Sequence, residues 1–382
     1  MSLNQNEIRE SLQSETLELH KNSNYRSTVS LSVGTGKTIV AIKRLEENFK
    51  KNKKCKLLFT GCRELYLENF KKELAKFKCE YLLKNLTLCC IQSLHIYNQI
   101  QFDCIIIDES HKHISLYLPF IENQFRLNPN IEILGLTGTP VSERNKYFSR
   151  LNDIIPICIK KSINNSVEIG LINDYKIILV PHRLSENLNI HVKTDKYDFK
   201  TSELKSYNSL IKKYNSVLEY GVSGFPKELM NLKFFFKNLK SKVDIINTII
   251  NNHKDDKILV YAGSIEQTKN YNYPAYHSKI ESDIRKQLYN WFLKVKKGVL
   301  INVDAIKESL SIPHLNIGII SHLGSSDSNA DQILGRFERL IPNKELGVLY
   351  ILYAKNTIEE KWVNNAIKNL DKTKIEYEKR FY

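Results

Sequence analysis

The chain has 382 residues, of which 42% are hydrophobic, and it carries a formal net charge of +15. This length predicts about two to three domains at roughly 150 residues each, and the apolar content is ample for buried cores. The charge favours a polyanionic partner, most commonly nucleic acid, although charge alone also fits basic proteins with other functions.

Cysteine usage and hydropathy exclude further classes. None of the seven cysteines forms a C-x-x-C pair, and all lie in the first half of the chain. This argues against a zinc site or a disulfide framework and favours reduced thiols in a cytoplasmic protein. No apolar run approaches the ~20 residues that span a bilayer. The first residues also have no signal-peptide pattern, so we expect no membrane partner.

Short apolar runs alternate with helical patterns through the first half of the chain, which predicts an α/β fold with a parallel sheet. Near-continuous apolar runs are typical of a sheet that is covered on both faces. The expected strands are 28–31, 56–60, 86–90, 104–108 and 131–137. Helices are expected over 39–48 and 63–77.

The second half repeats this alternation after a helical segment. Residues 170–180 are expected to cross into a second unit, and a long helix-prone stretch rich in Lys and Phe covers 229–252. The strands expected after it are 257–261, 298–303, 317–321 and 346–352, followed by a helix over 357–370.

The pattern as a whole predicts two α/β domains with a helical segment between them. We place the first domain at 1–170 and the second at 256–382. Residues 171–255 would form a crossing strand and the helical segment, attached to the second domain.

A glycine-rich loop separates the first expected strand from the first expected helix. Gly34 and Gly36 let the backbone approach phosphate oxygens where a Cβ would clash, and the amides around Thr35 would face the anion at a helix N-terminus. Lys37 would reach the β- and γ-phosphates, and Thr38 would offer its hydroxyl to magnesium. The flanking strand and helix favour a nucleotide site over an ordinary glycine turn.

The expected strand 104–108 ends in two acids at the carboxyl edge of the sheet, where α/β sites form. Asp108 would hold magnesium through its hydration shell, and Glu109 would orient and deprotonate the attacking water. An isolated strand that ends in Asp-Glu is also a common strand–turn boundary. The hypothesis therefore depends on the phosphate loop upstream.

Two further motifs follow in order. LTGTP at 136–140 ends the last expected strand of the first half, and Q-x-x-G-R-x-x-R over 332–339 is expected on a helix. At i and i+3, Arg336 and Arg339 share a face, and such arginines stabilise the transition state of phosphoryl transfer. Gln332 lies one turn earlier and would touch the attacking water. The alternative interpretation of LTGTP is a turn that ends the strand. The alternative for residues 332–339 is a solvated basic helix face.

Together, GTGKT at 34–38, DESH at 108–111, LTGTP and QILGRFER resemble the motifs of superfamily-2 helicases and translocases. The resemblance spans about residues 8 to 362. It is nearest to the compact phage-type UvsW branch-migration enzymes. It implies two RecA-like domains that bind ATP and Mg²⁺ in a cleft, with Arg336 and Arg339 closing on the γ-phosphate.

The resemblance also implies coupling residues and nucleic-acid contacts. His111 and the third-motif residues Thr137, Gly138 and Thr139 would couple hydrolysis to the grip on nucleic acid. The positions that match backbone-contacting motifs of the family are Arg63, Gln92, Ser93, Gly263, Ser264, His277 and Lys279. Spacing also suggests a nucleotide-base motif at Gln13. Each contact position, taken singly, also fits an ordinary surface residue.

The chain departs from the family pattern in two places. Leu31 stands where the common phosphate-loop pattern begins with glycine. In the fifth motif, Ser309 and Ser311 replace the Gly and Asp of the Glu-Gly-x-Asp-Ile-Pro that many relatives have. The loss of that Asp puts part of the coupling in doubt, but it does not touch the acid–magnesium chemistry.

The resemblance thus implies a monomeric, cytoplasmic, phage-encoded DNA helicase or translocase that works with replication or recombination proteins. DNA is favoured over RNA, and an RNA helicase is the alternative of the same class. The alternative of another class is an ATPase that clamps or remodels nucleic acid without unwinding it, which the fifth-motif departure keeps open.

Overall fold

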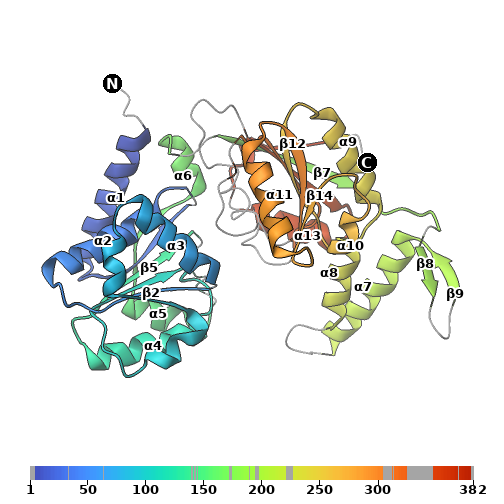
Figure 1. Cartoon of the computed structure of the whole chain (residues 1–382). Coiled ribbons are helices and arrows are strands. Elements are labelled where there is room, and N and C mark those ends of the chain that lie inside the picture. The colour runs from blue at the N-terminus through green and yellow to red at the C-terminus, as the bar shows by residue number, and fades with distance from the viewer. Residues whose placement is uncertain are drawn as a thin grey trace. The chain divides into compact units, whose positions relative to one another are not determined.

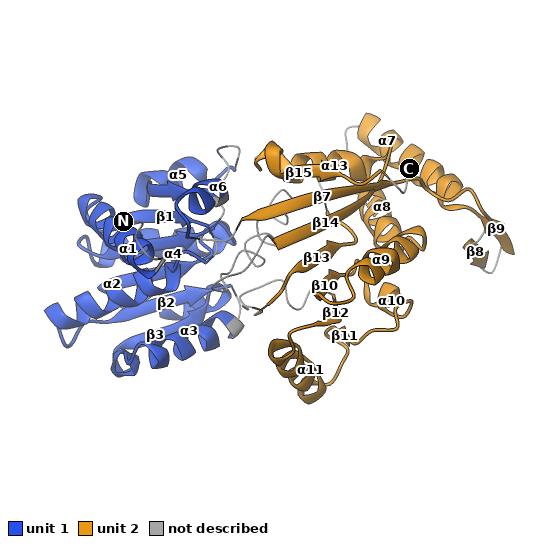
Figure 2. Cartoon of the chain, turned by 90° about the horizontal axis from the view of Figure 1, so that it is seen from above, with its two compact units in different colours: residues 1–172 blue, residues 173–382 orange. Residues whose placement is uncertain are grey.

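The chain folds as two compact units, residues 1–172 and 173–382 (Figures 1 and 2). The computed structural model describes residues 5–32, 34–62, 64–138, 141, 143, 145–171, 174–188, 190–193, 198–220, 227–303, 312, 314–324, 347–368 and 370–379. Over these residues each unit contains one large parallel sheet, so the predicted fold class of two parallel-sheet α/β domains is confirmed. No helix in the described ranges is long and apolar enough to cross a membrane.

The sheet of the first unit has the strand order β3-β2-β4-β5-β1-β6. Its strands are β1 Arg26–Leu31, β2 Leu57–Gly61, β3 Leu86–Cys90, β4 Cys104–Asp108, β5 Glu132–Thr137 and β6 Ile157–Lys161. The five strands expected in this half are all present. The edge strand β6 was not predicted, because its five residues include two lysines and only one of the five is buried.

Helices cover both faces of this sheet, as its near-continuous apolar strands require. They are α1 Gln5–Asn22, α2 Lys37–Lys51, α3 Glu64–Lys76, α4 Ile114–Leu127, α5 Phe148–Ile154 and α6 Ile163–Glu168, with 3-10 turns η1 Glu80–Lys84 and η2 Ile91–Tyr97. Along β4, Ile106 packs in the core that contains Leu45 of α2, whereas Ile105 and Ile107 pack in the core that contains Ile121 of α4. This alternation holds β4 rigidly and carries its polar end to the edge of the sheet.

The sheet of the second unit has the order β11-β12-β10-β13-β14-β7-β15. Its strands are β7 Tyr175–His182, β10 Lys257–Tyr261, β11 Ala275–Tyr276, β12 Gly298–Asn302, β13 Ile317–Ile320, β14 Gly347–Ala354 and β15 Ile375–Tyr377. The other elements of this unit are β8 Ile190–Lys193, β9 Asp198–Thr201, α7 Glu203–Glu219, α8 Lys227–Lys237, α9 Ser241–Asn252, α10 Ile265–Thr268, α11 Ser282–Lys294, α13 Ile358–Ile367 and the 3-10 turn η3 Lys372–Lys374.

The helix-prone stretch 229–252 is helical, and it forms two helices. The stretch breaks between α8 and α9, and the two helices belong to different cores. Leu232 and Phe236 of α8 pack with Tyr207 of α7 and with α13. Ile246 and Ile249 of α9 pack against the sheet instead. The antiparallel ribbon β8–β9, beside α7 in Figure 1, was also not predicted.

Candidate functional site

The phosphate loop joins the buried strand β1 to helix α2. Gly36 has φ +96° and Gly34 has φ +88°, backbone conformations that favour glycine. Gly36 is also the N-cap of α2, so the loop places main-chain amides at a helix N-terminus. The Lys37 ammonium donates to the carbonyl oxygens of Leu31 (2.8 Å) and Ser32 (3.1 Å). The loop therefore holds this positive charge beside its own backbone.

Helix α1 lies against this loop through Gln13. A Cβ at Gly36 would be 2.7 Å from Gln13 Nε2, so the end of the Gln13 side chain would have to shift, and φ +96° would strain any residue with a Cβ at this position. The Gln13 side chain is 3% exposed, and the Lys43 ammonium donates to its Oε1 (2.9 Å). The structure thus brings Gln13 to the phosphate loop from a distant part of the sequence.

Asp108 and Glu109 stand at the carboxyl end of β4. Glu109 has φ +51°, an uncommon conformation for a residue with a Cβ, and its amide donates to Asp108 Oδ1 (3.0 Å). Burial and the neighbouring Glu109 carboxylate raise the pKa of Asp108 to about 7, while the Lys37 charge opposes this rise. The two acids and the phosphate-loop lysine therefore belong to one electrostatic site.

His111 connects this acid pair to the end of β5. Its Nδ1 is 2.8 Å from Thr137 Oγ1 and 3.3 Å from Glu109 Oε2. Burial lowers the pKa of His111, so its imidazole is neutral at pH 7. The Ser110 amide donates to the Leu136 carbonyl (2.9 Å), which holds the turn against β5. The DESH and LTGTP motifs thus meet through a side-chain contact that the sequence did not predict.

The oxygen donors near the loop fit magnesium. Mg²⁺ is held by one or two carboxylates together with water and substrate phosphates, and it needs no cage of protein ligands. The described ranges contain no cluster of three or more His, Cys, Asp or Glu residues placed to hold a metal. Thr38 lies in the first turn of α2, and Asp108 is a partly buried carboxylate whose pKa is raised by burial and by the neighbouring Glu109 charge. These two residues would hold the ion, which would neutralise charge on the phosphates.

The positions matched to nucleic-acid motifs differ in their surroundings. Gln92, in η2, is exposed, and its Nε2 donates weakly to the Cys62 carbonyl (3.4 Å); Ser93 beside it is partly buried. Lys279 is exposed after β11, and burial with the nearby Lys279 charge lowers the pKa of His277. Gln92 and Ser93 belong to the first unit, and His277 and Lys279 belong to the second.

At the end of β10, the groups of the fourth motif already serve the fold. The Gly263 amide donates to Gln267 Oε1 (2.8 Å). The Ser264 hydroxyl caps α10 by accepting from the Gln267 amide (3.1 Å) and donates to Asn238 Oδ1 (2.5 Å). The loop is therefore fixed both to α10 and to the end of α8.

We expect Gly263→Ala to destabilise the second unit by about 1–3 kcal/mol, the usual cost of overpacking. A Cβ here would be 2.6 Å from the Lys237 carbonyl oxygen and 2.7 Å from its Cα, and backbone atoms cannot move aside like a side chain. Denaturant unfolding measures the change. Gly324→Ala is the matched control, because a Cβ there has nothing within 4 Å. Equal stability of the two variants would contradict the packing argument.

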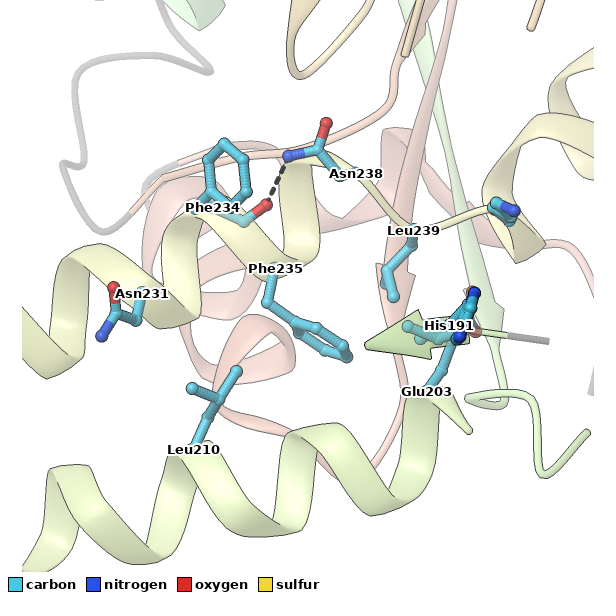
Figure 3. A pocket seen from close by; sticks show the side chains of 10 residues that line it. His191, Glu203, Leu210, Asn231, Phe234, Phe235, Asn238 and Leu239 are labelled. Carbon is cyan, nitrogen blue, oxygen red and sulfur yellow. Dashed lines mark hydrogen bonds between the residues drawn. The ribbon is translucent and has the colours of Figure 1, made fainter. Parts of the chain in front are cut away.

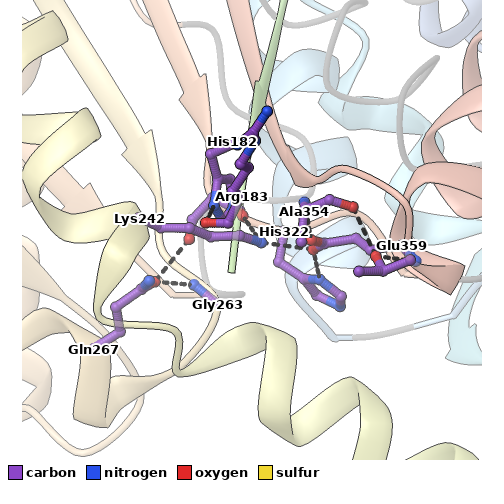
Figure 4. Close-up of polar contacts among 10 residues, drawn as sticks. His182, Arg183, Lys242, Gly263, Gln267, His322, Ala354 and Glu359 are labelled. Carbon is purple, nitrogen blue, oxygen red and sulfur yellow. Dashed lines mark hydrogen bonds and ion pairs between the residues drawn. The ribbon is translucent and has the colours of Figure 1, made fainter. Parts of the chain in front are cut away.

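A buried ion pair lies at the carboxyl edge of the second sheet (Figure 4). The Lys242 ammonium donates to Glu359 Oε1 (2.6 Å) and to the Ser321 carbonyl (2.8 Å), and both charged side chains are 0% exposed. The Glu359 carboxylate also accepts a hydrogen bond from the Ala354 amide (2.8 Å) and contacts His322 Nδ1 (2.7 Å). Burial alone would raise the pKa of Glu359, but Lys242 and His322 lower it to about 2. This network, which the sequence did not predict, joins α9 to α13.

Several predicted site residues, together with the two fifth-motif serines, lie outside the described residues. They are Arg63, Thr139, Ser309, Ser311, Gln332, Arg336 and Arg339. The described part of the predicted nucleotide site is therefore the part that the first unit supplies.

Two protein families match the sequence. Residues 3–142 match the family described as type III restriction enzyme, res subunit. Residues 241–340 match the helicase conserved C-terminal domain. No curated protein matches the chain.

Several solved structures share the fold. The ATP-dependent type ISP restriction-modification enzyme LlaBIII bound to DNA has a TM-score of 0.60 at 15% identity, covering 95% of this chain and 29% of that one. The Hef helicase domain of Pyrococcus furiosus has a TM-score of 0.54 at 13% identity, covering 93% of this chain and 97% of that one. Mss116p bound to ssRNA and AMP-PNP has a TM-score of 0.55 at 16% identity, covering 93% and 71%. The present chain thus spans under a third of LlaBIII, and at these identities the likeness concerns the fold alone.

Proposed function

This chain belongs to superfamily 2 of the ATP-hydrolysing helicases and translocases, with two RecA-like domains, and from this premise we propose that it uses ATP to move along or remodel DNA. The observation that carries the proposal is the convergence of Lys37, Asp108, Glu109, His111 and Thr137 in the first unit. A phosphate loop, an acid pair and a coupling contact at one sheet edge are what phosphoryl transfer to water requires.

Each residue of this site has a distinct role. Lys37 and the loop amides bind the phosphates, and Thr38 and Asp108 hold magnesium. Glu109 orients the attacking water and takes its proton. The contact between His111 and Thr137 couples ATP hydrolysis at the acid pair to the third motif at the end of β5. As their sequence motif implies, Gln332 would contact the attacking water, and Arg336 and Arg339 would stabilise the transition state.

We also propose that the nucleic acid is DNA. The protein would be a monomeric, cytoplasmic phage enzyme, similar to UvsW, that works with replication or recombination proteins. The motif resemblance and the net charge of +15 support this. An RNA helicase is the first alternative, since one structural neighbour is bound to ssRNA. A clamp that does not unwind is the second, because Ser309 and Ser311 depart from the fifth-motif pattern.

We expect DNA to stimulate ATP turnover and to bind in a salt-sensitive manner. Phosphate contacts release counterions, so log affinity for single strands falls with log salt by about 0.7 per contact. ATPase rates would be titrated with single- and double-stranded DNA and RNA at about 50 and 200 mM salt. Unwinding of forked DNA and RNA, measured beside them, separates a helicase from a clamp.

The control for this experiment is Lys37→Ala protein, which reports any contaminating ATPase. Stronger stimulation by RNA than by DNA would favour the RNA alternative. Stimulation without unwinding would favour the clamp or a pure translocase. Good basal turnover that no polymer stimulates would contradict the proposed function.

A further inference from the structure

A pocket of about 630 Å³ lies between α7, α8 and the ribbon strand β8 (Figure 3). None of the motifs described above uses it. Its apolar walls come from Ile190, Leu210 and Phe235, and Asn238 and Lys240 contribute polar groups. A volume of this order is within the range of pockets that bind small organic groups. We call it the α7–α8 pocket.

An aromatic ring on this pocket is exposed. Phe234 lines it with 68% of its surface exposed, an unusual setting for a large apolar ring. Phe235, which points into the pocket in Figure 3, is held by stacking on Tyr207, with ring centroids 6.4 Å apart. One fixed ring and one exposed ring beside amide side chains suit a flat, polar-edged aromatic ligand.

The charge around the pocket indicates what that ligand is attached to. The described residues 198–220 and 227–240 include eight lysines and four acidic residues. Lys240 lines the pocket itself and is exposed. A second copy of the chain docked face to face would set lysines against lysines, so self-association is disfavoured. Basic side chains interleaved with aromatic rings are the pattern of single-strand nucleic-acid binding.

The pocket is also joined to the loop of the fourth motif. Asn238 lines the pocket and accepts the hydrogen bond from Ser264, 2.5 Å away. At the other end, the buried Glu203 carboxylate accepts from the Ser185 amide (3.0 Å) and the Ser241 amide (3.1 Å). The hydrogen bond to Ser264 therefore fixes the pocket beside the end of β10. Ser264 is a position that matches a backbone-contacting motif of the family.

We propose that the α7–α8 pocket receives an unpaired nucleobase, which stacks on Phe234, while Lys240 meets the adjoining phosphate. This rests on the proposed function, because the strand would be the one along which the motor moves. The shared chemistry is an unpaired base on a phosphate backbone, from either DNA or RNA. The protein would then bind single strands that carry bases more tightly than abasic strands.

The test uses the full chain with Phe234→Ala, whose exposed position makes the substitution safe for folding. Tyr377→Ala is the matched control, because Tyr377 is also exposed, at 53%, but lies on β15. Binding would be measured with oligothymidylate, oligouridylate and an abasic strand of equal length. Quenching of 2-aminopurine placed within the oligonucleotide reports stacking directly.

We expect Phe234→Ala to weaken binding of base-bearing strands by about 5- to 150-fold, the range for loss of one stacked base. Binding of the abasic strand, basal ATP turnover and the Tyr377→Ala protein should be unchanged, and quenching should be lost. Stronger binding of oligothymidylate than oligouridylate, or the reverse, identifies the strand.

Three results would overturn the inference. If polymers stimulate the wild type but Phe234→Ala binds and quenches as the wild type does, this inference fails and the proposed function stands. If no polymer binds the wild type, both fail. If light scattering shows a dimer that Phe234→Ala dissociates without a change in strand binding, the pocket belongs to a contact between two copies.

Discussion

Glu109→Gln is expected to slow ATP turnover by about 10²- to 10⁴-fold, the usual contribution of a general base, while ATP still binds. The amide keeps the size and hydrogen-bonding reach of the side chain but cannot accept the proton of water. Asp108, Thr38 and Lys37 remain in place to hold the nucleotide and the ion. Steady-state turnover, with binding of a fluorescent ATP analogue measured separately, checks both parts.

The control for this variant is Glu10→Gln, which makes the same change at an exposed position of α1. It should leave turnover unaltered. Near-normal turnover in Glu109→Gln would remove Glu109 from its role as the base. A parallel loss of binding would instead mean that the substitution disturbs the turn in which Glu109 has φ +51°.

The second large effect is expected from Lys242→Met, which should destabilise the protein by about 3–5 kcal/mol. The substitution removes the ammonium and leaves the buried Glu359 carboxylate with only the Ala354 amide and His322 as partners, and a buried charge that loses its main countercharge is strongly unfavourable. Methionine keeps much of the side-chain volume, so the loss of stability comes from the missing charge and not from a cavity. Denaturant unfolding followed by circular dichroism measures it.

Two further variants make this result specific. Lys269→Met breaks an ion pair with Glu266 whose side chains are 66% and 70% exposed, and it should cost less than about 1 kcal/mol. The double variant Lys242→Met with Glu359→Leu should recover much of the loss, because it replaces the pair by apolar groups. Similar losses from Lys242→Met and Lys269→Met would show that the buried pair has no special weight.

The sequence alone determined the features that depend on local pattern. The run Cys104–Asp108 predicts β4 residue for residue, because a strand buried on both faces must be apolar along its length and can become polar only at its end. The phosphate loop was predicted for a similar reason, since glycines, lysine and threonine act within five neighbouring positions. The α/β alternation predicted two parallel sheets by the same local reasoning.

The tertiary structure decided what depends on residues distant in the sequence. Lys242 and Glu359 are 117 positions apart, and neither residue alone indicates a buried charge, because both types usually lie at the surface. The break between α8 and α9 follows from two different cores, which helix periodicity does not reveal. The contact of His111 with Thr137 and the α7–α8 pocket likewise exist only because strands and helices pack side by side. Local propensity reports the shape of a segment, whereas the partners of its side chains are chosen by the folded chain as a whole.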